Sequence, residues 1–109
     1  MATYLERRIP EQFIQTINNT GGSVQVFTEI ANNDEVTLLQ INNTSTTSQT
    51  IYLGFGQPAV VGINPLGPGF TWLEGMDNEA RPWGGKVNAI ASADGATISV
   101  QRRIRPRVI

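Results

Sequence analysis

Two tryptophans and three acidic residues are the side chains whose types and spacing could do chemistry in this chain. Trp72 and Trp83 flank a stretch that contains Glu74, Asp77 and Glu79. Aromatic faces with polar groups between them are typical of sugar-binding sites, and paired carboxylates carry out glycoside hydrolysis. The same acids offer oxygens to calcium, but the stretch lacks the glycine and further acids of a known calcium loop. We favour a fourth interpretation, in which the indoles cover one end of the domain or pack in a subunit contact.

A second candidate motif is glycine-rich. Residues 54–59, GFGQPA, match the GxGxxA pattern that brings a nucleotide pyrophosphate to a helix N-terminus. The pattern needs a helix directly after it, and Gly62, Pro65 and Pro68 interrupt every candidate. We therefore expect the glycines to form a bend at the rim of a sheet, and we expect no nucleotide cofactor.

The C-terminus gathers half of the chain's basic residues, which are Arg102, Arg103, Arg105 and Arg107. These arginines could contact phosphates, an acidic partner surface or water. Apolar residues, including Ile104 and Ile109, alternate with them and would be disfavoured at a chain end unless they dock. We favour docking on a neighbouring subunit or partner over a solvated tail, and we disfavour nucleic acid.

The composition removes several classes of function. The chain has no Cys and no His, so it lacks a thiolate nucleophile and the commonest general base and metal ligand. Charged residues make up 16% of the 109 residues, below the roughly 25% usual for soluble domains. The N-terminus carries Glu6, Arg7 and Arg8 with no apolar run, so neither a signal peptide nor a membrane span is expected. The sequence thus indicates a polar but charge-poor domain without a cofactor.

The elements that must position these residues are strands. Short segments of alternating apolar and polar residues are separated by turn signals, at residues 11–17, 23–31, 35–42, 51–55, 70–73, 86–92 and 96–103. This spacing predicts an all-β fold, a β-sandwich or jelly roll, with a small closed barrel as the alternative. Asp94-Gly95 predicts a hairpin between the last two strands. Apolar residues on both faces of the segment 35–42 predict a central strand.

The chain is expected to form one β-sandwich domain between two arms. An N-terminal arm covers residues 1–10, the domain residues 11–103, and a basic tail residues 104–109, because Pro106 cannot continue a strand ladder. Within the domain, prolines and glycines stiffen the loop 58–69. A stiff loop loses little entropy on docking, so we expect a neighbouring molecule there.

Three segments, VTLLQINNTSTTSQTIYLGFG, PAVVGINPLGPGFTW and GGKVNAIASADGATISVQ, resemble a family of small bacteriophage virion proteins. The acidic ending of that family is replaced here by Gln101 and the arginine-rich tail. The resemblance implies a β-sandwich accessory protein of the head or tail, a decoration or cement protein on a capsid shell. It also implies a trimer or other cyclic oligomer, a location in the virion, and the major capsid protein or another virion protein as partner.

We therefore expect a structural protein and not an enzyme, with no cofactor, no metal and no membrane partner. The expected contact residues are Tyr4, Leu5, Arg7, Arg8, Pro65, Trp72, Trp83, Arg102, Arg103, Arg105, Arg107 and Ile109. Two rival hypotheses remain open. One is a fibre or tail adhesin that binds host surface glycans through Trp72 and Trp83, and the other is a small hydrolase that uses Glu74 and Asp77.

Overall fold

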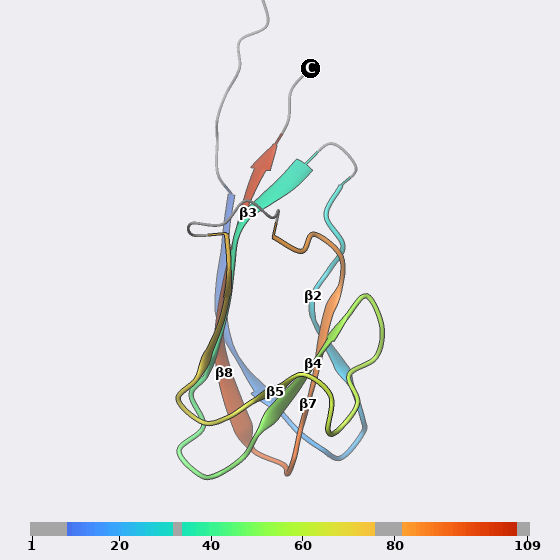
Figure 1. Ribbon diagram of the computed structural model, residues 1–109, viewed down its shortest axis with the longest axis vertical. Helices are drawn as coiled ribbons and strands as arrows, with labels where there is room; N and C mark the ends of the chain where they lie inside the picture. Colours follow the sequence, from blue (N-terminus) through green and yellow to red (C-terminus); the bar gives the residue numbers. More distant parts are fainter. Residues whose placement is uncertain (1–8, 32–33, 76–81, 107–109) are drawn as a thin grey trace, which may run out of the picture.

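Two four-stranded antiparallel sheets pack face to face in the computed structural model, which describes residues 9–31, 34–75 and 82–106 (Figure 1). The first sheet contains, in spatial order, β1 (Ile9–Ile17), β8 (Ala96–Pro106), β3 (Asp34–Asn43) and β6 (Thr71–Glu74). The second contains β2 (Val24–Phe27), β7 (Val87–Ala91), β4 (Ile51–Phe55) and β5 (Pro65–Leu66). No helix occurs in the described part of the chain, and the predicted β-sandwich is confirmed.

The strand pairing is nested. β1 pairs with β8, β2 with β7, β3 with β6 and β4 with β5, all antiparallel. This is the order obtained when one long hairpin is rolled up so that its strands alternate between two sheets, which is the jelly-roll topology. The further pairings of β3 with β8 and β4 with β7 join the nested pairs into two continuous sheets. As predicted, β3 is an interior strand.

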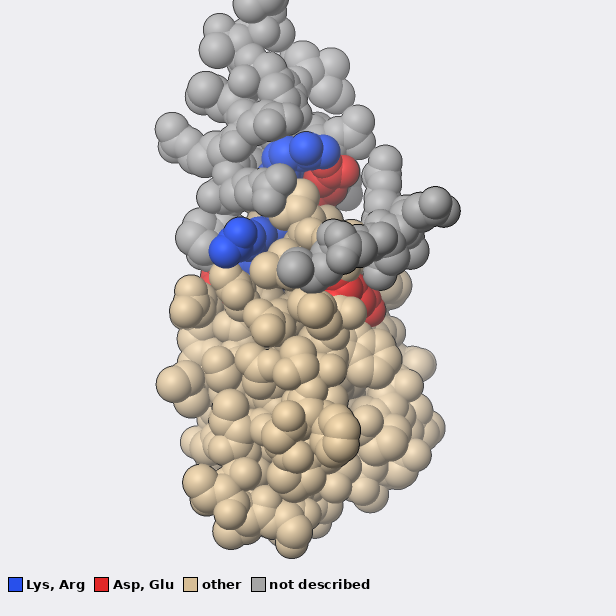
Figure 2. All heavy atoms as spheres, turned by 60° about the vertical axis from the view of Figure 1, so that its left-hand side comes forward, with Lys and Arg blue, Asp and Glu red and all other residues tan. Residues whose placement is uncertain are grey.

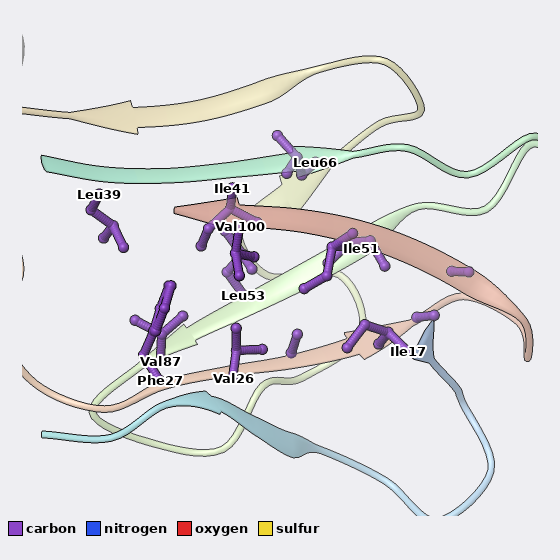
Figure 3. Packing of buried hydrophobic residues seen from close by; sticks show 14 of the residues in the cluster. Ile17, Val26, Phe27, Leu39, Ile41, Ile51, Leu53, Leu66, Val87 and Val100 are labelled. Carbon is purple, nitrogen blue, oxygen red and sulfur yellow. The ribbon is translucent and has the colours of Figure 1, made fainter. Parts of the chain in front are cut away.

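The core lies between the sheets, and both contribute to it. Leu39, Ile41 and Val100 point inward from the first sheet and meet Phe27 and Leu53 from the second (Figure 3). A β-bulge between Val36 and Leu38 shifts the alternation of β3, so Val36 and Leu39 both face the core.

One strand is shorter than the sequence predicts. The pattern at residues 23–31 predicts a single strand, but β2 ends at Phe27. A register shift between Gln25 and Phe27 turns both Val26 and Phe27 inward, so the two lie on one side despite being adjacent. The alternation predicted for residues 23–31 therefore breaks at Val26 and Phe27.

The predicted hairpin at Asp94-Gly95 is also wrong. Asp94 and Gly95 do form a turn, but β7 belongs to the second sheet and β8 to the first, so the turn does not join two paired strands. The side chain of Asp94 accepts hydrogen bonds from the backbone N–H groups of Asn19 and Thr20, at 2.9 and 2.8 Å. Gly95 N–H donates to Asn18 Oδ1 at 2.9 Å. The turn is thus tied to the β1–β2 connection and carries the chain across the sandwich.

Both ends of the domain extend further than predicted. β1 starts at Ile9, inside the predicted arm, and β8 runs to Pro106, inside the predicted tail. Pro106 is the last residue of β8 and pairs with Asp34 of β3, so the prediction that this proline cannot continue the ladder is wrong. A proline at the end of a strand costs the ladder little.

Candidate contact surfaces

Trp72, Glu74 and Trp83 form a hydrogen-bonded cluster that stabilises the fold. The indole N–H of Trp72 donates to Glu74 Oε2 at 2.9 Å, and the backbone N–H of Trp83 donates to Oε1 at 2.8 Å. Both carboxylate oxygens are thus occupied by donors from the flanking residues. Glu74 ties β6 to the segment that leads into β7. Asp77 and Glu79, the other acids of this stretch, lie outside the described residues.

Trp72 and Trp83 do not form one open aromatic platform. Trp72 lies on the inner face of β6 and packs against Phe55, with ring centroids 5.2 Å apart. Trp83 meets the same Phe55 edge to face at 6.2 Å, and its indole N–H donates to the carbonyl oxygen of Lys86 at 2.9 Å. A Cβ at Gly85 would lie 2.6 Å from the Trp83 ring, so the ring rests directly on glycine backbone. Both indoles thus pack against Phe55 of their own chain, as a cover over this end of the domain would.

Arg102 is a core residue and not an exposed tail residue. Its side chain is 1% exposed, and its guanidinium carbon lies 4.5 Å from the centroid of the Phe27 ring. Nε donates to Glu11 Oε1 at 2.5 Å and a terminal nitrogen donates to the Thr28 carbonyl at 2.8 Å. The guanidinium therefore links three strands or strand ends inside the sandwich and is not available to a partner. The alternation of Ile98 and Val100 with Arg102 could have predicted this burial.

The remaining predicted contact residues have different surroundings. Arg103 is exposed, while Arg105 forms an ion pair with Glu35 that joins β8 to β3. Pro65 is exposed on β5, at the edge of the second sheet. The other predicted contact residues lie outside the described residues: Tyr4, Leu5, Arg7, Arg8, Arg107 and Ile109.

Charge divides the sandwich into two halves. The terminal half is the half in which β1 and β3 begin and β8 ends. The turn half is the opposite one, and it contains the loop 57–64 and the turns 18–22, 44–50, 67–70 and 92–95. Figure 2 shows Lys, Arg, Asp and Glu gathered in the terminal half and an uncharged surface below it. Within the described residues the terminal half contains Glu11, Glu29, Asp34, Glu35, Glu74, Lys86, Arg102, Arg103 and Arg105.

Asp94 is the charged residue that the structure describes in the turn half, and its charge is locally compensated. The backbone N–H of Thr20 holds the pKa of Asp94 below its ordinary value, with smaller effects from the Thr20 hydroxyl and the Asn19 N–H. The hydroxyl donates to Oδ2 at 2.8 Å. The carboxylate thus serves to fasten two turns together.

The turn half exposes large apolar side chains that no charge accompanies. Val60, Val61 and Ile63 are 52%, 50% and 55% exposed on the loop 57–64, and Phe70 is 68% exposed on the turn 67–70. Ile14 is 76% exposed on the outer face of β1. The prolines and glycines predict the stiff loop, and Pro65 is the loop residue predicted to make a contact. The exposed residues Val60, Val61 and Ile63 were not predicted, although the apolar run VVGI in a stretch that could be neither strand nor helix indicates them.

The exposed apolar residues are held by regular turns. The Ile63 N–H donates to the Val60 carbonyl at 3.1 Å, and the Phe70 N–H donates to the Gly67 carbonyl at 3.0 Å. Gly62 and Gly69 have φ of 98° and 80°, as the third residue of a type II turn requires. Both turns therefore present apolar side chains from a defined backbone.

The loop 57–64 is fastened to the second sheet on both sides. The Asn64 side chain donates to the Leu53 carbonyl at 3.1 Å, and the Leu53 N–H donates to the Asn64 carbonyl at 3.2 Å. The Asn88 side chain donates to the Gln57 carbonyl at 2.7 Å. A Cβ at Gly54 would lie 2.4 Å from that carbonyl oxygen, so the loop backbone packs directly on β4. The bend predicted at Gly54 and Gly56 is explained by this packing of the loop backbone on Gly54.

Shallow hollows accompany these surfaces, and two of them differ in the charge of their lining. One, of about 410 Å³, lies beside the turn 67–70 and is lined by Thr50, Pro65, Leu66, Gly67, Phe70 and Thr71. The other, of about 430 Å³, lies in the terminal half, and its lining includes Glu29, Asp34, Trp83 and Lys86. The first hollow has no charged lining residue, while the second has three.

No protein-family model matches the sequence, and no curated protein matches it at a significant level. Among residues 9–31, 34–75 and 82–106 no helix is long and apolar enough to cross a membrane. In the same residues no group of three or more acidic, His or Cys side chains could hold a metal ion.

Proposed function

We propose that this protein is a structural virion protein that decorates or cements a capsid shell. Its partner is the major capsid protein or another virion protein, and it acts as a homo-oligomer, with a trimer favoured. The observation that carries the proposal is the turn half, where ordered turns display Val60, Val61, Ile63 and Phe70 on a nearly uncharged surface. Apolar side chains exposed on ordered turns suit a docking surface, because ordered turns lose little entropy when they dock.

The fold and the resemblance support the same function. Jelly rolls recur in viral capsid domains and in lectins, which is an analogy at the level of fold alone. The resemblance of the segments around IYLGFG and GGKVNAIAS to small phage virion proteins favours the capsid among these. Glu74 favours a binding protein over a hydrolase, because both of its oxygens already accept hydrogen bonds that hold Trp72 and Trp83 in place.

Cosedimentation with empty shells of the virus that encodes the chain tests the proposal. The wild-type protein is expected to pellet with the shells and to saturate at a fixed number of copies per shell. Shells that lack the major capsid protein's outer surface, such as proteolysed shells, serve as the control. Protein that stays in the supernatant at every concentration would overturn the proposal.

A second candidate function is glycan binding, because the hollow in the terminal half combines an exposed indole with ionic groups. Trp83 is 38% exposed and shares this hollow with Glu29, Asp34 and Lys86. An aromatic face with polar side chains at its rim suits a sugar ring. Glycan-array binding that is lost in both Trp83→Phe and Glu29→Gln would favour this function, whereas an array without signal would remove it.

A further inference from the structure

We propose that the turn at residues 60–63 of one copy docks in the hollow beside Phe70 of the next copy, so that the protein closes into a ring. The turn supplies Val60, Val61 and Ile63, and the hollow is formed by Pro65, Leu66, Gly67 and Phe70 with two threonines. The inference rests on the proposed function, since it takes a second copy of this chain as the occupant of the hollow.

The two surfaces match in chemistry. The turn consists of aliphatic side chains about half exposed, and the hollow of about 410 Å³ is lined by apolar side chains, glycine backbone and threonine. Neither contains a charged residue, so docking leaves no charge without a partner. A copy of the same chain brings no charge to this contact, because the charges that the structure describes lie in the terminal half, apart from the hydrogen-bonded Asp94.

The turn and the hollow face different sides of the sandwich. β5 lines the hollow, and in Figure 1 the loop after β4 lies on the right of the sandwich while the turn that leads into β6 lies on the left. A projecting surface on one side and a receiving surface on the other define a head-to-tail contact. Such contacts close into a ring when the rotation between copies allows it, and otherwise propagate as a filament.

The available surface is large enough for such an assembly. A standard interface takes about 800 Å² from each partner, and a ring member uses two such patches. Two patches amount to about a quarter of the 6548 Å² accessible surface of the chain. On the face that Figure 2 shows, the surface of the turn half is uncharged.

The rigidity of both surfaces favours this contact. Residues 60–63 and 67–70 each form a type II turn with a hydrogen bond, and the loop 57–64 is fastened to β4 and β7. The backbone of these turns therefore does not have to be ordered on association. A turn that is already in its bound shape loses less entropy than a flexible loop of the same composition.

Mixing two variants tests the head-to-tail contact directly. Val61→Asp places a charge on the turn, and Phe70→Asp places one at the hollow. Native mass measurement of the full chain is expected to give a closed ring for the wild type and monomers for each variant alone. Mixed together, the two variants are expected to give a 1:1 dimer and nothing larger, because only one intact turn and one intact hollow remain per pair.

Controls separate this result from loss of folding. Circular dichroism spectra of both variants are expected to match that of the wild type, since Val61 and Phe70 are exposed, and each variant is expected to unfold in one cooperative transition. Ile14→Asp, a change of the same kind on the outer face of β1, is expected to keep the ring. A monomeric wild type, an unchanged mass for Val61→Asp, or a mixture that stays monomeric would each overturn the inference.

The outcome is separable from the proposed function. A monomer that saturates empty shells would leave the decoration function standing without the ring. A ring that does not bind the shells would support the head-to-tail contact and overturn the decoration function.

Discussion

The two halves of the sandwich use their side chains in opposite ways. In the terminal half, charged and aromatic groups are turned toward one another: Arg102 against Glu11 and Phe27, and Glu74 against Trp72 and Trp83. In the turn half, apolar side chains such as Val61 and Phe70 are turned toward solvent. The difference teaches that the charged residues and tryptophans, whose types could support catalysis or ligand binding, stabilise the fold. The residues exposed for contact with a partner are apolar and carry no reactive group.

The strongest test of this comparison is Arg102 in the terminal half. Arg102→Ala removes a buried guanidinium that pairs with Glu11 and covers Phe27. We expect a loss of about 3 kcal/mol in the free energy of unfolding, at the low end for a broken buried pair because Glu11 can still reach water. Urea unfolding followed by tryptophan fluorescence measures this change.

Neighbouring variants sharpen the prediction for Arg102. Arg103→Ala, next to it but exposed, is expected to change stability by less than about 0.5 kcal/mol. Arg102→Met restores apolar cover over Phe27 and is expected to lie between alanine and wild type. Equal stability of Arg102→Ala and Arg103→Ala would show that the tail arginines are alike and that the comparison fails.

Gly54 tests whether the apolar loop is a fixed part of the turn half. In Gly54→Ala the new Cβ would lie 2.4 Å from the Gln57 carbonyl oxygen and 2.7 Å from the Ala59 nitrogen. Backbone must move to make room, so we expect a loss of about 2 to 3 kcal/mol in thermal or urea unfolding.

Gly62→Ala is the matched control on the same loop. It has free space around its Cβ but a φ of 98°, which costs roughly 1 kcal/mol for alanine. If Gly54→Ala were as mild as Gly62→Ala, the loop would not be packed on β4, and its side chains would not be held in place for docking.

Asp94 gives the smallest effect and a pH dependence. Its folded pKa is lowered by the Thr20 N–H, the Thr20 hydroxyl and the Asn19 N–H. A lowered folded pKa means that the carboxylate stabilises the fold fully above its unfolded pKa of about 3.9, and that this stabilisation is lost as pH falls through the folded value. Melting temperatures of the wild type and Asp94→Asn should therefore differ at about pH 6 and converge below about pH 4. A difference that stays constant with pH would assign another role to Asp94.

The sequence was sufficient for the class of fold because the strand signals are local. Alternation in residues 51–55 and 96–103 and the turn residues between segments predicted a β-sandwich or jelly roll, and this is confirmed. The sheet to which each strand belongs depends on contacts between residues far apart in the sequence. Asp94-Gly95 has the composition of a hairpin turn, but Asn18, Asn19 and Thr20, far away in sequence, draw it across the sandwich.

The candidate site was predictable only in part for the same reason. The stiffness of the loop 58–69 follows from its prolines and glycines, but the exposure of Val60, Val61 and Ile63 depends on how the loop packs against Gly54. The prediction of Arg102 as a contact residue is wrong, because Arg102 lies two residues after Val100 on an alternating strand and so faces the core. Burial of a charge depends on partners such as Glu11 that lie at the other end of the chain.

Shell binding measured against salt concentration tests the central claim, that an uncharged surface makes the contacts. Charged contacts weaken steeply as the Debye length falls from about 14 Å to about 4 Å between about 0.05 and 0.5 M NaCl, whereas apolar contacts do not. We predict that the number of copies bound per empty shell and the half-saturation concentration stay nearly constant over this range. Binding that is strong at low salt and lost at high salt would place the contacts on the arginines and contradict the claim.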